Sequence, residues 1–219
     1  YNVITCARNQ DALEELNAEL ARERRTIFTY KVDLRREEEI QLLFREIADQ
    51  PGPLDVLVNN AGLGFNAPLC SGDTDYWRAI LEVNVLAVCI CTREAIRIMN
   101  RHNRPGHIVN ICSLSGHRLG PEGGLYAASK FALSAITETL RRELLDNNSR
   151  IKVSQISPGL VKTEFHQKFH QDLAVAENIY NQYPPLTPED IAEAVYFAIS
   201  QPTNVNVNDI VLRPMGQSL

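Results

Sequence analysis

Short apolar runs alternate with amphipathic helical patterns along almost the whole chain. Each apolar run is bounded by polar or turn residues, as in a buried strand, and the stretches between the runs repeat apolar residues at helical spacing. This alternation favours βα units, because two parallel strands are joined by a crossover segment that is usually a helix. The sequence therefore predicts a doubly wound α/β fold with a mostly parallel sheet and helices on both faces. The expected strands cover residues 3–6, 26–32, 54–58, 107–111, 152–156 and 209–212.

The expected helices are marked by apolar stripes and by one clear start signal. Residues 40–47 carry apolar side chains at positions i, i+3, i+4 and i+7. Thr187 predicts the first residue of another helix, since its capping hydroxyl is followed by Pro188 and early carboxylates. Residues 164–185 are polar and aromatic without a clear period, and a looser segment is expected there. The other expected helices cover residues 13–20, 74–99, 126–145 and 187–200.

Composition restricts the class of protein. A chain of 219 residues with 44% hydrophobic residues is long enough to form one domain with a well-buried core. The net charge is -5 and no basic cluster is present, which argues against a nucleic-acid partner. No apolar run approaches the roughly 18 residues that a membrane-spanning helix needs, and the first residues do not form a signal peptide. A cytoplasmic protein is expected.

The cysteine and histidine patterns predict neither disulfides nor a metal site. Five cysteines form no C-x-x-C pair, and most lie in apolar stretches, so buried reduced thiols are expected. His166 and His170 have the spacing of a zinc pair, but no third ligand accompanies them in a usable pattern.

Tyr126 and Lys130 are four residues apart, so on a helix their side chains share one face. A phenol is a weak acid with an unperturbed pKa near ~10, and a nearby ammonium favours the phenolate and lowers that pKa. The pair could therefore move a proton at a carbonyl or alcohol oxygen. Taken alone, the same spacing is common on ordinary amphipathic helices.

Three further signals accompany this pair in a specific order. An Asn-Asn-Ala-Gly turn at residues 59–62 follows one expected strand, Ser113 follows the next, and a Pro-Gly-x-x-x-Thr segment covers residues 158–163. With these motifs the chain resembles the short-chain dehydrogenase/reductase family over essentially its whole length. The resemblance implies a single NAD(P)-binding Rossmann-like domain over residues 1–219 and an oxidoreductase that moves a hydride between a nicotinamide and an alcohol carbon.

The resemblance implies a role for each matching catalytic residue. Tyr126 is expected to be the acid/base, and Ser113 to donate a hydrogen bond to the substrate oxygen. Lys130 is expected to stabilise the phenolate and to bind the nicotinamide ribose. Asn84 matches the residue that holds a water in the proton relay, although a lone helical Asn is otherwise an ordinary polar residue.

The resemblance also implies a cofactor site, whose residues come from several strand ends. One set matches the turn beside the adenine ribose, a second matches the adenine contact, and a third matches the segment that binds the nicotinamide carboxamide. Two of them also have a structural alternative: the first set could simply form a tight turn, and Asp33 could cap the next helix. The three sets are Asn60, Ala61 and Gly62; Asp33 and Leu34; and Pro158, Gly159, Val161 and Thr163.

Arg8 bears on the choice between NAD and NADP. An Asp at the end of the second strand binds the ribose 2′-hydroxyl in NAD enzymes. Here the strand ends in Thr-Cys-Ala-Arg, and a guanidinium suits a 2′-phosphate through charge-assisted, forked hydrogen bonds. NADP is therefore the expected cofactor, the alternative for Arg8 being a solvated surface residue.

The family pattern begins with a strand, a glycine-rich turn and a helix, a unit of about 30 residues. This chain begins directly in the segment that resembles the family's second strand. An N-terminally incomplete domain is expected, without the central strand and without the glycine turn that approaches the cofactor pyrophosphate.

Substrate and partners are the least constrained predictions. Residues 113–118 and 212–214 look most like the farnesol dehydrogenase-like branch of the family, which implies a small apolar alcohol or carbonyl substrate. Residues 165–183 would then be either an apolar lid or core, and His117 either a substrate contact or a solvated residue. Family members usually form dimers or tetramers through the helices that correspond to residues 74–99 and 126–145. The alternative function is a cofactor-sensing binding protein, or an inactive fragment, of the same fold.

Overall fold

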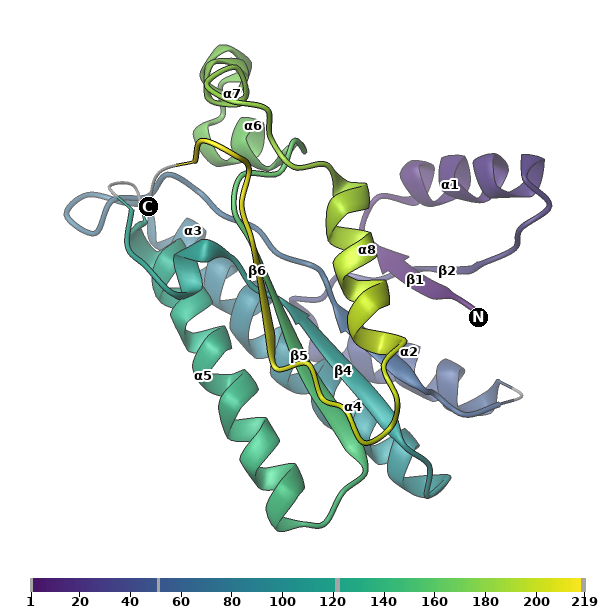
Figure 1. Ribbon diagram of the computed structural model, residues 1–219. Coiled ribbons are helices and arrows are strands. Elements are labelled where there is room, and N and C mark those ends of the chain that lie inside the picture. The colour runs from purple at the N-terminus through teal and green to yellow at the C-terminus, as the bar shows by residue number, and fades with distance from the viewer. Residues whose placement is uncertain (1, 51, 121–122, 218–219) are drawn as a thin grey trace. The chain divides into compact units, whose positions relative to one another are not determined.

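The structure, a computed structural model, describes residues 2–50, 52–120 and 123–217. It consists of two compact units, Tyr1–Gly52 and Pro53–Leu219. Strands alternate with helices in both, which confirms the predicted α/β class (Figure 1). That the whole chain forms one domain stays a prediction.

The first unit is a pair of βα repeats. Its elements in chain order are β1 (Ile4–Ala7), α1 (Gln10–Arg22), β2 (Phe28–Lys31) and α2 (Glu37–Asp49). The two strands pair in parallel, so the residues that follow them, Arg8 and Val32, belong to the same edge of this small sheet. The predicted stripe of α2 is buried at Ile40, Leu43 and Phe44.

The second unit contains a parallel sheet in the strand order β3, β4, β5, β6. The strands are β3 (Val56–Asn59), β4 (Gly106–Ile111), β5 (Ile151–Pro158) and β6 (Asp209–Leu212). Each agrees with an expected strand to within two residues. All three pairings are parallel, and the carboxyl ends of the strands therefore meet at one edge of the sheet.

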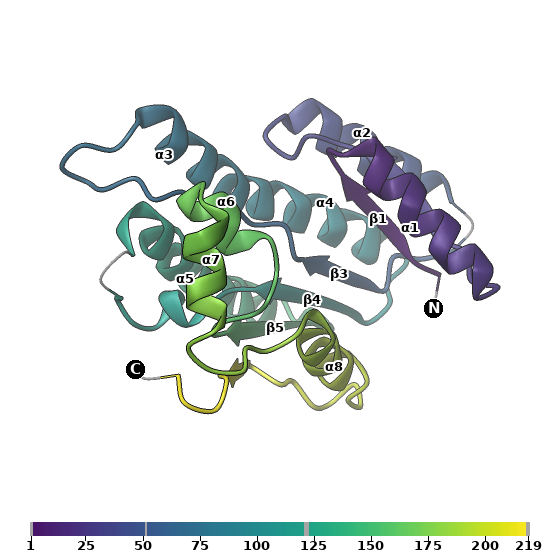
Figure 2. The same ribbon diagram turned by 90° about the horizontal axis from the view of Figure 1, so that it is seen from above.

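Helices cover both faces of this sheet (Figures 1 and 2). On one face, Cys112 after β4 packs with Val88 and Leu133 of the helices α4 (Ala87–Arg101) and α5 (Gly124–Asp146). On the other face, Val109 and Ile156 pack against α8 (Pro188–Ile199). Alternate residues of a strand point to opposite faces of the sheet. Val109 and Cys112 are three positions apart, which explains why they belong to the cores on opposite faces. Burial of each such side chain contributes about 1.5–3 kcal/mol.

The long helix predicted over residues 74–99 is interrupted. α3 (Thr74–Leu81) passes through a π-helical turn, η1 (Glu82–Leu86), into α4. A π turn adds a residue to the helix without changing its general direction, so the apolar period of the sequence does not reveal it. The turn contains the candidate catalytic residue Asn84.

The segment predicted to be loose, residues 164–185, forms two short helices. These are α6 (Phe165–His170) and α7 (Leu173–Tyr180). Asp172 caps α7, because its side chain accepts hydrogen bonds from the amides of Ala174 and Val175. Helices of six and eight residues span at most about two turns, which is too short for the sequence to show a repeat.

The start of α8 agrees with its prediction. The Thr187 hydroxyl accepts the Asp190 amide, and the Asp190 carboxylate accepts the Thr187 amide, which together form a capping box with Pro188 in the first turn. Across the described ranges, none of the helices combines the length and the apolarity that crossing a membrane requires.

The cysteine prediction is correct in one part and wrong in another. No disulfide links the cysteines of the described chain. Cys91 and Cys112 are buried and Cys6 is partly buried, but Cys70 and Cys89 are exposed. Apolar neighbours in sequence did not decide burial, because Cys89 lies on the outer side of its helix.

Candidate active site

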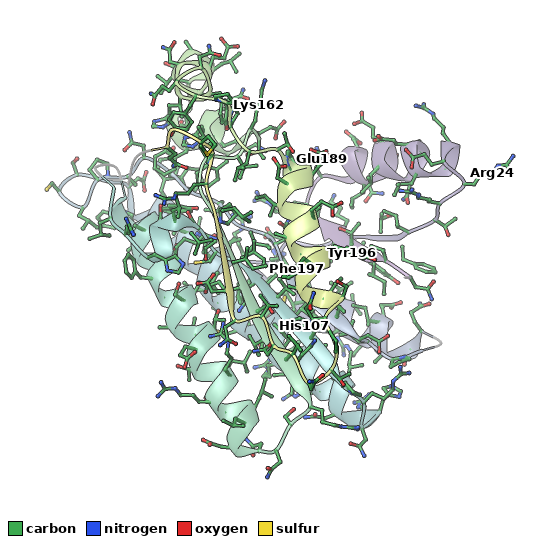
Figure 3. All side chains as sticks on the ribbon, viewed as in Figure 1. Arg24, His107, Lys162, Glu189, Tyr196 and Phe197 are labelled. Atoms are coloured by element: carbon green, nitrogen blue, oxygen red, sulfur yellow. The ribbon has the colours of Figure 1, made fainter. Side chains whose placement is uncertain are left out.

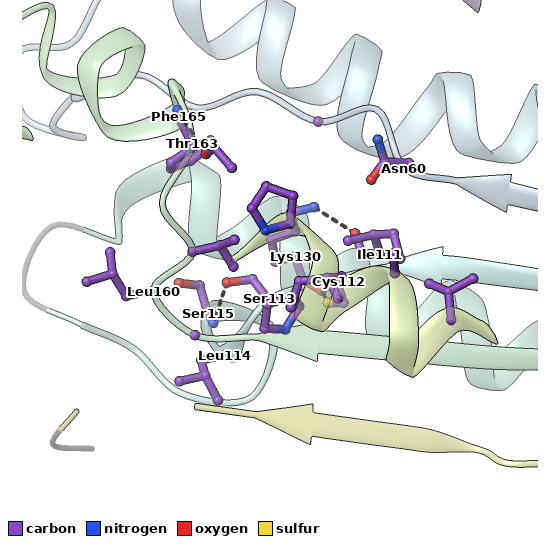
Figure 4. Close-up of a pocket in the computed structure, with 18 of the residues that line it drawn as sticks. Asn60, Ile111, Cys112, Ser113, Leu114, Ser115, Lys130, Leu160, Thr163 and Phe165 are labelled. Carbon is purple, nitrogen blue, oxygen red and sulfur yellow. Dashed lines mark hydrogen bonds between the residues drawn. The ribbon is translucent and has the colours of Figure 1, made fainter. Parts of the chain in front are cut away.

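The candidate site lies at the carboxyl ends of β3, β4 and β5. A pocket of about 800 Å³ opens there, and most of the predicted site residues of the second unit line it (Figure 4). Chain segments that are far apart in sequence meet at this edge because the strands are parallel. The predicted residues that line the pocket are Asn60, Gly62, Ser113, Tyr126, Lys130, Pro158, Gly159, Val161 and Thr163.

Ser113 follows β4 and caps the short turn η2 (Leu114–Gly116). Its hydroxyl oxygen accepts the Ser115 amide at 3.1 Å (Figure 4). The same hydroxyl interacts with the phenol of Tyr126 and favours the ionised form of that phenol. The turn therefore aims a hydroxyl group at the candidate acid.

Tyr126 differs from its prediction in acidity. Burial raises the pKa of its phenol to about 12, although the Ser113 hydrogen bond acts in the opposite direction. The Lys130 ammonium, expected to lower this pKa, lies 5.8 Å from the ring centroid. At neutral pH the phenol is therefore protonated, and Tyr126 is in the form of a proton donor.

Lys130 is held between the end of β4 and the turn after β3. It is 4% exposed, its ammonium donates a hydrogen bond to the Ile111 carbonyl at 3.1 Å, and burial lowers its pKa (Figure 4). A Cβ atom at Gly62 would lie 3.4 Å from the Lys130 Nζ atom. The glycine of the Asn-Asn-Ala-Gly turn thus leaves space beside the ammonium.

Asn84 ties that turn to the helices. Its side-chain amide accepts the Leu63 amide at 2.9 Å and donates to the Leu63 carbonyl at 2.8 Å and to the Ser129 hydroxyl at 3.0 Å. Ser129 in turn donates to the Tyr126 carbonyl at 2.6 Å. Neither of the predicted site residues Asn84 and Ala61 lines the pocket. Asn84 is connected to Tyr126 indirectly, through the Ser129 hydroxyl.

The sequence reasoning missed a second buried amide network, which joins the strands to the helices behind them. Asn59 donates to Asn110 at 2.9 Å and to Thr92 at 3.1 Å, and Asn110 donates to Thr137 at 2.8 Å. All four side chains are buried, so their polar groups need these partners. The available signals were Asn110 inside one predicted buried strand and Asn59 directly after another.

Aromatic side chains from α6 cover Tyr126. The ring centroids of Phe165 and Phe169 lie 5.1 and 6.2 Å from that of Tyr126. Gly64 allows this packing, since a Cβ atom there would lie 2.8 Å from both phenylalanine rings and 3.0 Å from Tyr126. Both readings of this segment hold in part: Phe169 is buried core, whereas Phe165 and Ile179 line the pocket.

The sequence also singled out His117 and the pair His166 and His170. His117 does not line the pocket and instead contacts Ser157. The imidazole rings of His166 and His170 stack with centroids 5.8 Å apart. Within the described ranges, no group of three or more His, Cys, Asp or Glu side chains is placed to hold a metal ion.

The remaining predicted cofactor residues belong to the first unit. Arg8 and Asp33 follow β1 and β2, and Arg8 is exposed. The Arg35 guanidinium binds the Asp33 carboxylate at 2.5 Å and, with the weaker effect of Arg8, lowers the pKa of that carboxyl to about 2. Asp33 does not cap α2, because the helix begins after Arg36. Leu34 follows in the same connection.

Comparison with known proteins identifies the family. A model of the short chain dehydrogenases matches residues 1–174. Dehydrogenase/reductase SDR family member 11 of Mus musculus is 43% identical over 98% of this chain and 85% of its own length. Farnesol dehydrogenase of Aedes aegypti is 36% identical over 98% and 86%, respectively. Similarity to the farnesol dehydrogenase-like branch is thereby confirmed.

A solved structure extends this similarity to three dimensions. The closed form of serine dehydrogenase complexed with NADP+ has a TM-score of 0.91 and 32% identity, and the match covers 100% of this chain and 87% of that one. The chain belongs to the short-chain dehydrogenase family of oxidoreductases.

Proposed function

We propose that this protein is an NADP(H)-dependent oxidoreductase that interconverts a small apolar alcohol and its carbonyl compound. The observation that carries the proposal is that the Ser113 hydroxyl and the Tyr126 phenol line the same pocket and interact with one another there. Two hydroxyl groups that meet there can both reach one substrate oxygen. No metal is needed for that contact.

The protonated state of Tyr126 suits carbonyl reduction. Bound NADPH supplies the hydride, and negative charge then develops on the carbonyl oxygen. Tyr126 donates its proton to that oxygen while Ser113 stabilises the charge by a hydrogen bond. Lys130, which is positively charged and buried behind the ring, favours the phenolate that remains after the proton has left. Asn84 is proposed to complete the proton relay.

The lining of the pocket fits the nicotinamide end of the cofactor. Residues of the segment from Pro158 to Thr163 line the pocket, and so do Lys130 and Asn60; Thr163, Lys130 and Asn60 are labelled in Figure 4. Serine dehydrogenase with NADP+ and an alcohol dehydrogenase from Thermococcus sibiricus with 5-hydroxy-NADP support the choice of NADP. Asn60, Ala61 and Gly62 are proposed to border the adenine ribose. Arg8 is proposed to bind the 2′-phosphate, with Asp33 and Leu34 beside the adenine.

The pocket favours an apolar substrate over an amino acid. An amino acid carries a carboxylate and an ammonium, and both need charged or strongly polar partners when they are buried. Of the described residues that line the pocket, Lys130 is the one Lys, Arg, Asp or Glu, and it is assigned to the cofactor and the phenol. Many of the other lining side chains are apolar, among them Leu114, Leu160, Phe165 and Ile179.

The decisive experiment replaces Tyr126 with Phe in the natural full-length protein. Phe retains the ring but donates no proton, so carbonyl reduction should fall by about 10² to 10⁴ while NADPH affinity stays within a few-fold. Tyr183→Phe is the matched control, because it also removes a hydroxyl from a tyrosine that lines the pocket. Near-parental turnover by Tyr126→Phe would exclude this role. A parent protein that binds NADPH but reduces no carbonyl in a broad panel would favour the cofactor-sensing alternative.

Two further proposals concern the state of the protein. A homo-oligomer, dimer or tetramer, is proposed because apolar side chains on α3–η1 and α5 are exposed, including Leu81, Leu86 and Phe131. Tyr196 and Phe197 on α8 are also more than half exposed (Figure 3). A cytoplasmic location is proposed from the composition alone. Sedimentation and fractionation measurements test these two proposals.

A further inference from the structure

A cluster of four polar side chains lies beside the active site, on the face of the sheet that α5 covers. His117 comes from the residue after η2, Gln155 and Ser157 from β5, and Asp209 from β6. The His117 Nε2 atom lies 2.8 Å from the Ser157 hydroxyl and 3.3 Å from the Asp209 carboxylate. Gln155 and Ser157 are buried, whereas His117 and Asp209 each keep 31% of their side-chain surface exposed.

The shorter contacts of this cluster favour one pattern of donors and acceptors; the Gln155 amide nitrogen also lies 3.4 Å from the His117 Nε2 atom, a longer contact that is left out of this pattern. Ser157 donates its proton to the Asp209 carboxylate at 3.0 Å, so its oxygen is left to accept a hydrogen bond. The Gln155 amide donates to the same carboxylate at 3.2 Å. His117 therefore carries its proton on Nε2 and donates it toward the Ser157 hydroxyl and the Asp209 carboxylate.

A serine, a histidine and an aspartate in contact suggest a hydrolase triad, but the geometry opposes that function. A nucleophilic serine gives its proton to the imidazole and must be open to substrate. Ser157 gives its proton to the carboxylate and has an exposed fraction of 0%. The cluster is thus a partly buried hydrogen-bonded link and not a second catalytic centre.

The link joins two walls of the candidate active site. His117 ends the turn that Ser113 begins, and Ser157 directly precedes the Pro158–Gly159 segment. The turn is also pressed onto α5, because a Cβ atom at Gly116 would lie 2.5 Å from the Cys112 Sγ atom and 2.9 Å from the Lys130 carbonyl oxygen. Ser134 of α5 adds a hydrogen bond to the Gly116 carbonyl at 3.2 Å. Through His117, the turn is also attached to β5 and β6.

We propose that His117 is a positioning residue for the reaction: anchored by Ser157 and Asp209, it holds the turn so that the Ser113 hydroxyl stays in register with Tyr126. The inference rests on the proposed function and deepens it. A misplacement of about 1 Å at a reacting group can cost about a hundred-fold in rate. His117 itself touches neither the pocket nor the reacting atoms.

The test compares His117→Leu with His117→Gln in the natural full-length protein, each with and without Ser113→Ala. Gln places an N–H donor near the position of the imidazole Nε2, whereas Leu fills the space without a donor. His117→Leu should lower kcat for carbonyl reduction at least about ten-fold, with the NADPH Kd within about three-fold, and His117→Gln should restore most of the rate. In the Ser113→Ala background, His117→Leu should change kcat less than about two-fold, because the residue acts through Ser113. His102→Leu, at the exposed end of α4, is the matched control.

A second readout does not depend on activity. The Ser115 amide donates to the Ser113 hydroxyl, so its hydrogen-exchange rate reports on the position of that hydroxyl. Exchange of this amide should be at least about ten-fold faster in His117→Leu and nearly unchanged in His117→Gln.

Each outcome decides one of the two claims. An active enzyme whose kcat is unchanged by His117→Leu overturns the positioning role, and so does a loss that is the same with and without the Ser113 hydroxyl. If no carbonyl compound is reduced by the parent, the proposed function fails. Hydrogen exchange of the Ser115 amide then tests the role of His117 by itself. Unchanged exchange then overturns the role of His117, and faster exchange that Gln corrects supports it.

Discussion

The ammonium nitrogen of Lys130 lies 5.8 Å from the centroid of the Tyr126 ring and donates its hydrogen bond to the Ile111 carbonyl, not to the phenol. The Ser113 hydroxyl is the polar group that acts on the phenol and favours its ionised form. Burial thus outweighs the neighbouring charge, and Tyr126 is held as a neutral acid. The reducing direction uses this form as it stands, whereas alcohol oxidation requires the phenol to lose its proton first.

The acidity of Tyr126 can be measured directly. Its pKa in the folded protein, about 12, is higher than the value near ~10 expected in the unfolded chain. The contribution of Tyr126 to stability is therefore complete below about pH 10 and is lost as the pH rises through about 12. Ultraviolet titration of the parent minus Tyr126→Phe should show one tyrosine that ionises well above the ordinary range. A difference spectrum that titrates near ~10 would contradict the burial argument.

Arg8→Ala should weaken NADPH binding far more than NADH binding. The guanidinium is exposed after β1, in the position proposed for the 2′-phosphate, which NADH lacks. A charge-assisted hydrogen bond is worth about 1.5–3 kcal/mol, or roughly ten- to a hundred-fold in Kd. Calorimetric titration of both cofactors measures the two changes. Arg36→Ala, another exposed arginine of the same unit, is the control, and equal losses for NADPH and NADH would assign Arg8 another role.

Gly64→Ala should disturb the aromatic cover of Tyr126. The new methyl group would lie 2.8 Å from the rings of Phe165 and Phe169, where real side chains do not approach. Overpacking of this kind costs about 1–3 kcal/mol of unfolding free energy. Gly120→Ala is the matched control, because a Cβ atom there meets nothing within 4 Å. Denaturant unfolding measures the free energy of unfolding of both variants. Equal values would show that the aromatic rings over Tyr126 move aside without cost.

His107 should make the protein sensitive to acid. Burial, with a smaller effect of the Lys152 charge, lowers the pKa of this imidazole from 6.5 to about 4. Its Nε2 atom lies 2.8 Å from the Ser154 hydroxyl, which donates to the Val207 carbonyl and can therefore only accept from His107 (Figure 3). The neutral ring is the folded form, so its stabilising contribution is complete above about pH 6.5 and is lost as the pH falls through about 4.

A variant isolates this effect. His107→Gln keeps a donor toward Ser154 but does not titrate. Between pH 7 and pH 5 the parent should lose about 1–2 kcal/mol more unfolding free energy than His107→Gln. Urea unfolding at both pH values measures the difference, and His102→Gln serves as the exposed control. If the unfolding free energies of parent and variant change equally with pH, His107 is protonated without a cost in stability.

The sequence by itself determined the order of strands and helices, since burial of alternate or helically spaced side chains is a local pattern. It placed β4 to within one residue and predicted the capping box of α8 from Thr187. It also marked the polar residues that end each strand, and parallel pairing brings those ends to one edge. Ser113, Tyr126 and Lys130 could therefore be predicted together before any coordinates were known.

Tertiary structure decided what depends on contacts between distant segments. The π turn around Asn84 and the two short helices α6 and α7 carry no periodic signal that a sequence could show. The acidity of Tyr126 was predicted with the wrong sign, because spacing along a helix gives the distance to Lys130 but not the desolvation of the phenol. The link from His117 to Asp209 joins residues 92 positions apart in this numbering, and only the pairing of β5 with β6 brings them within hydrogen-bonding distance.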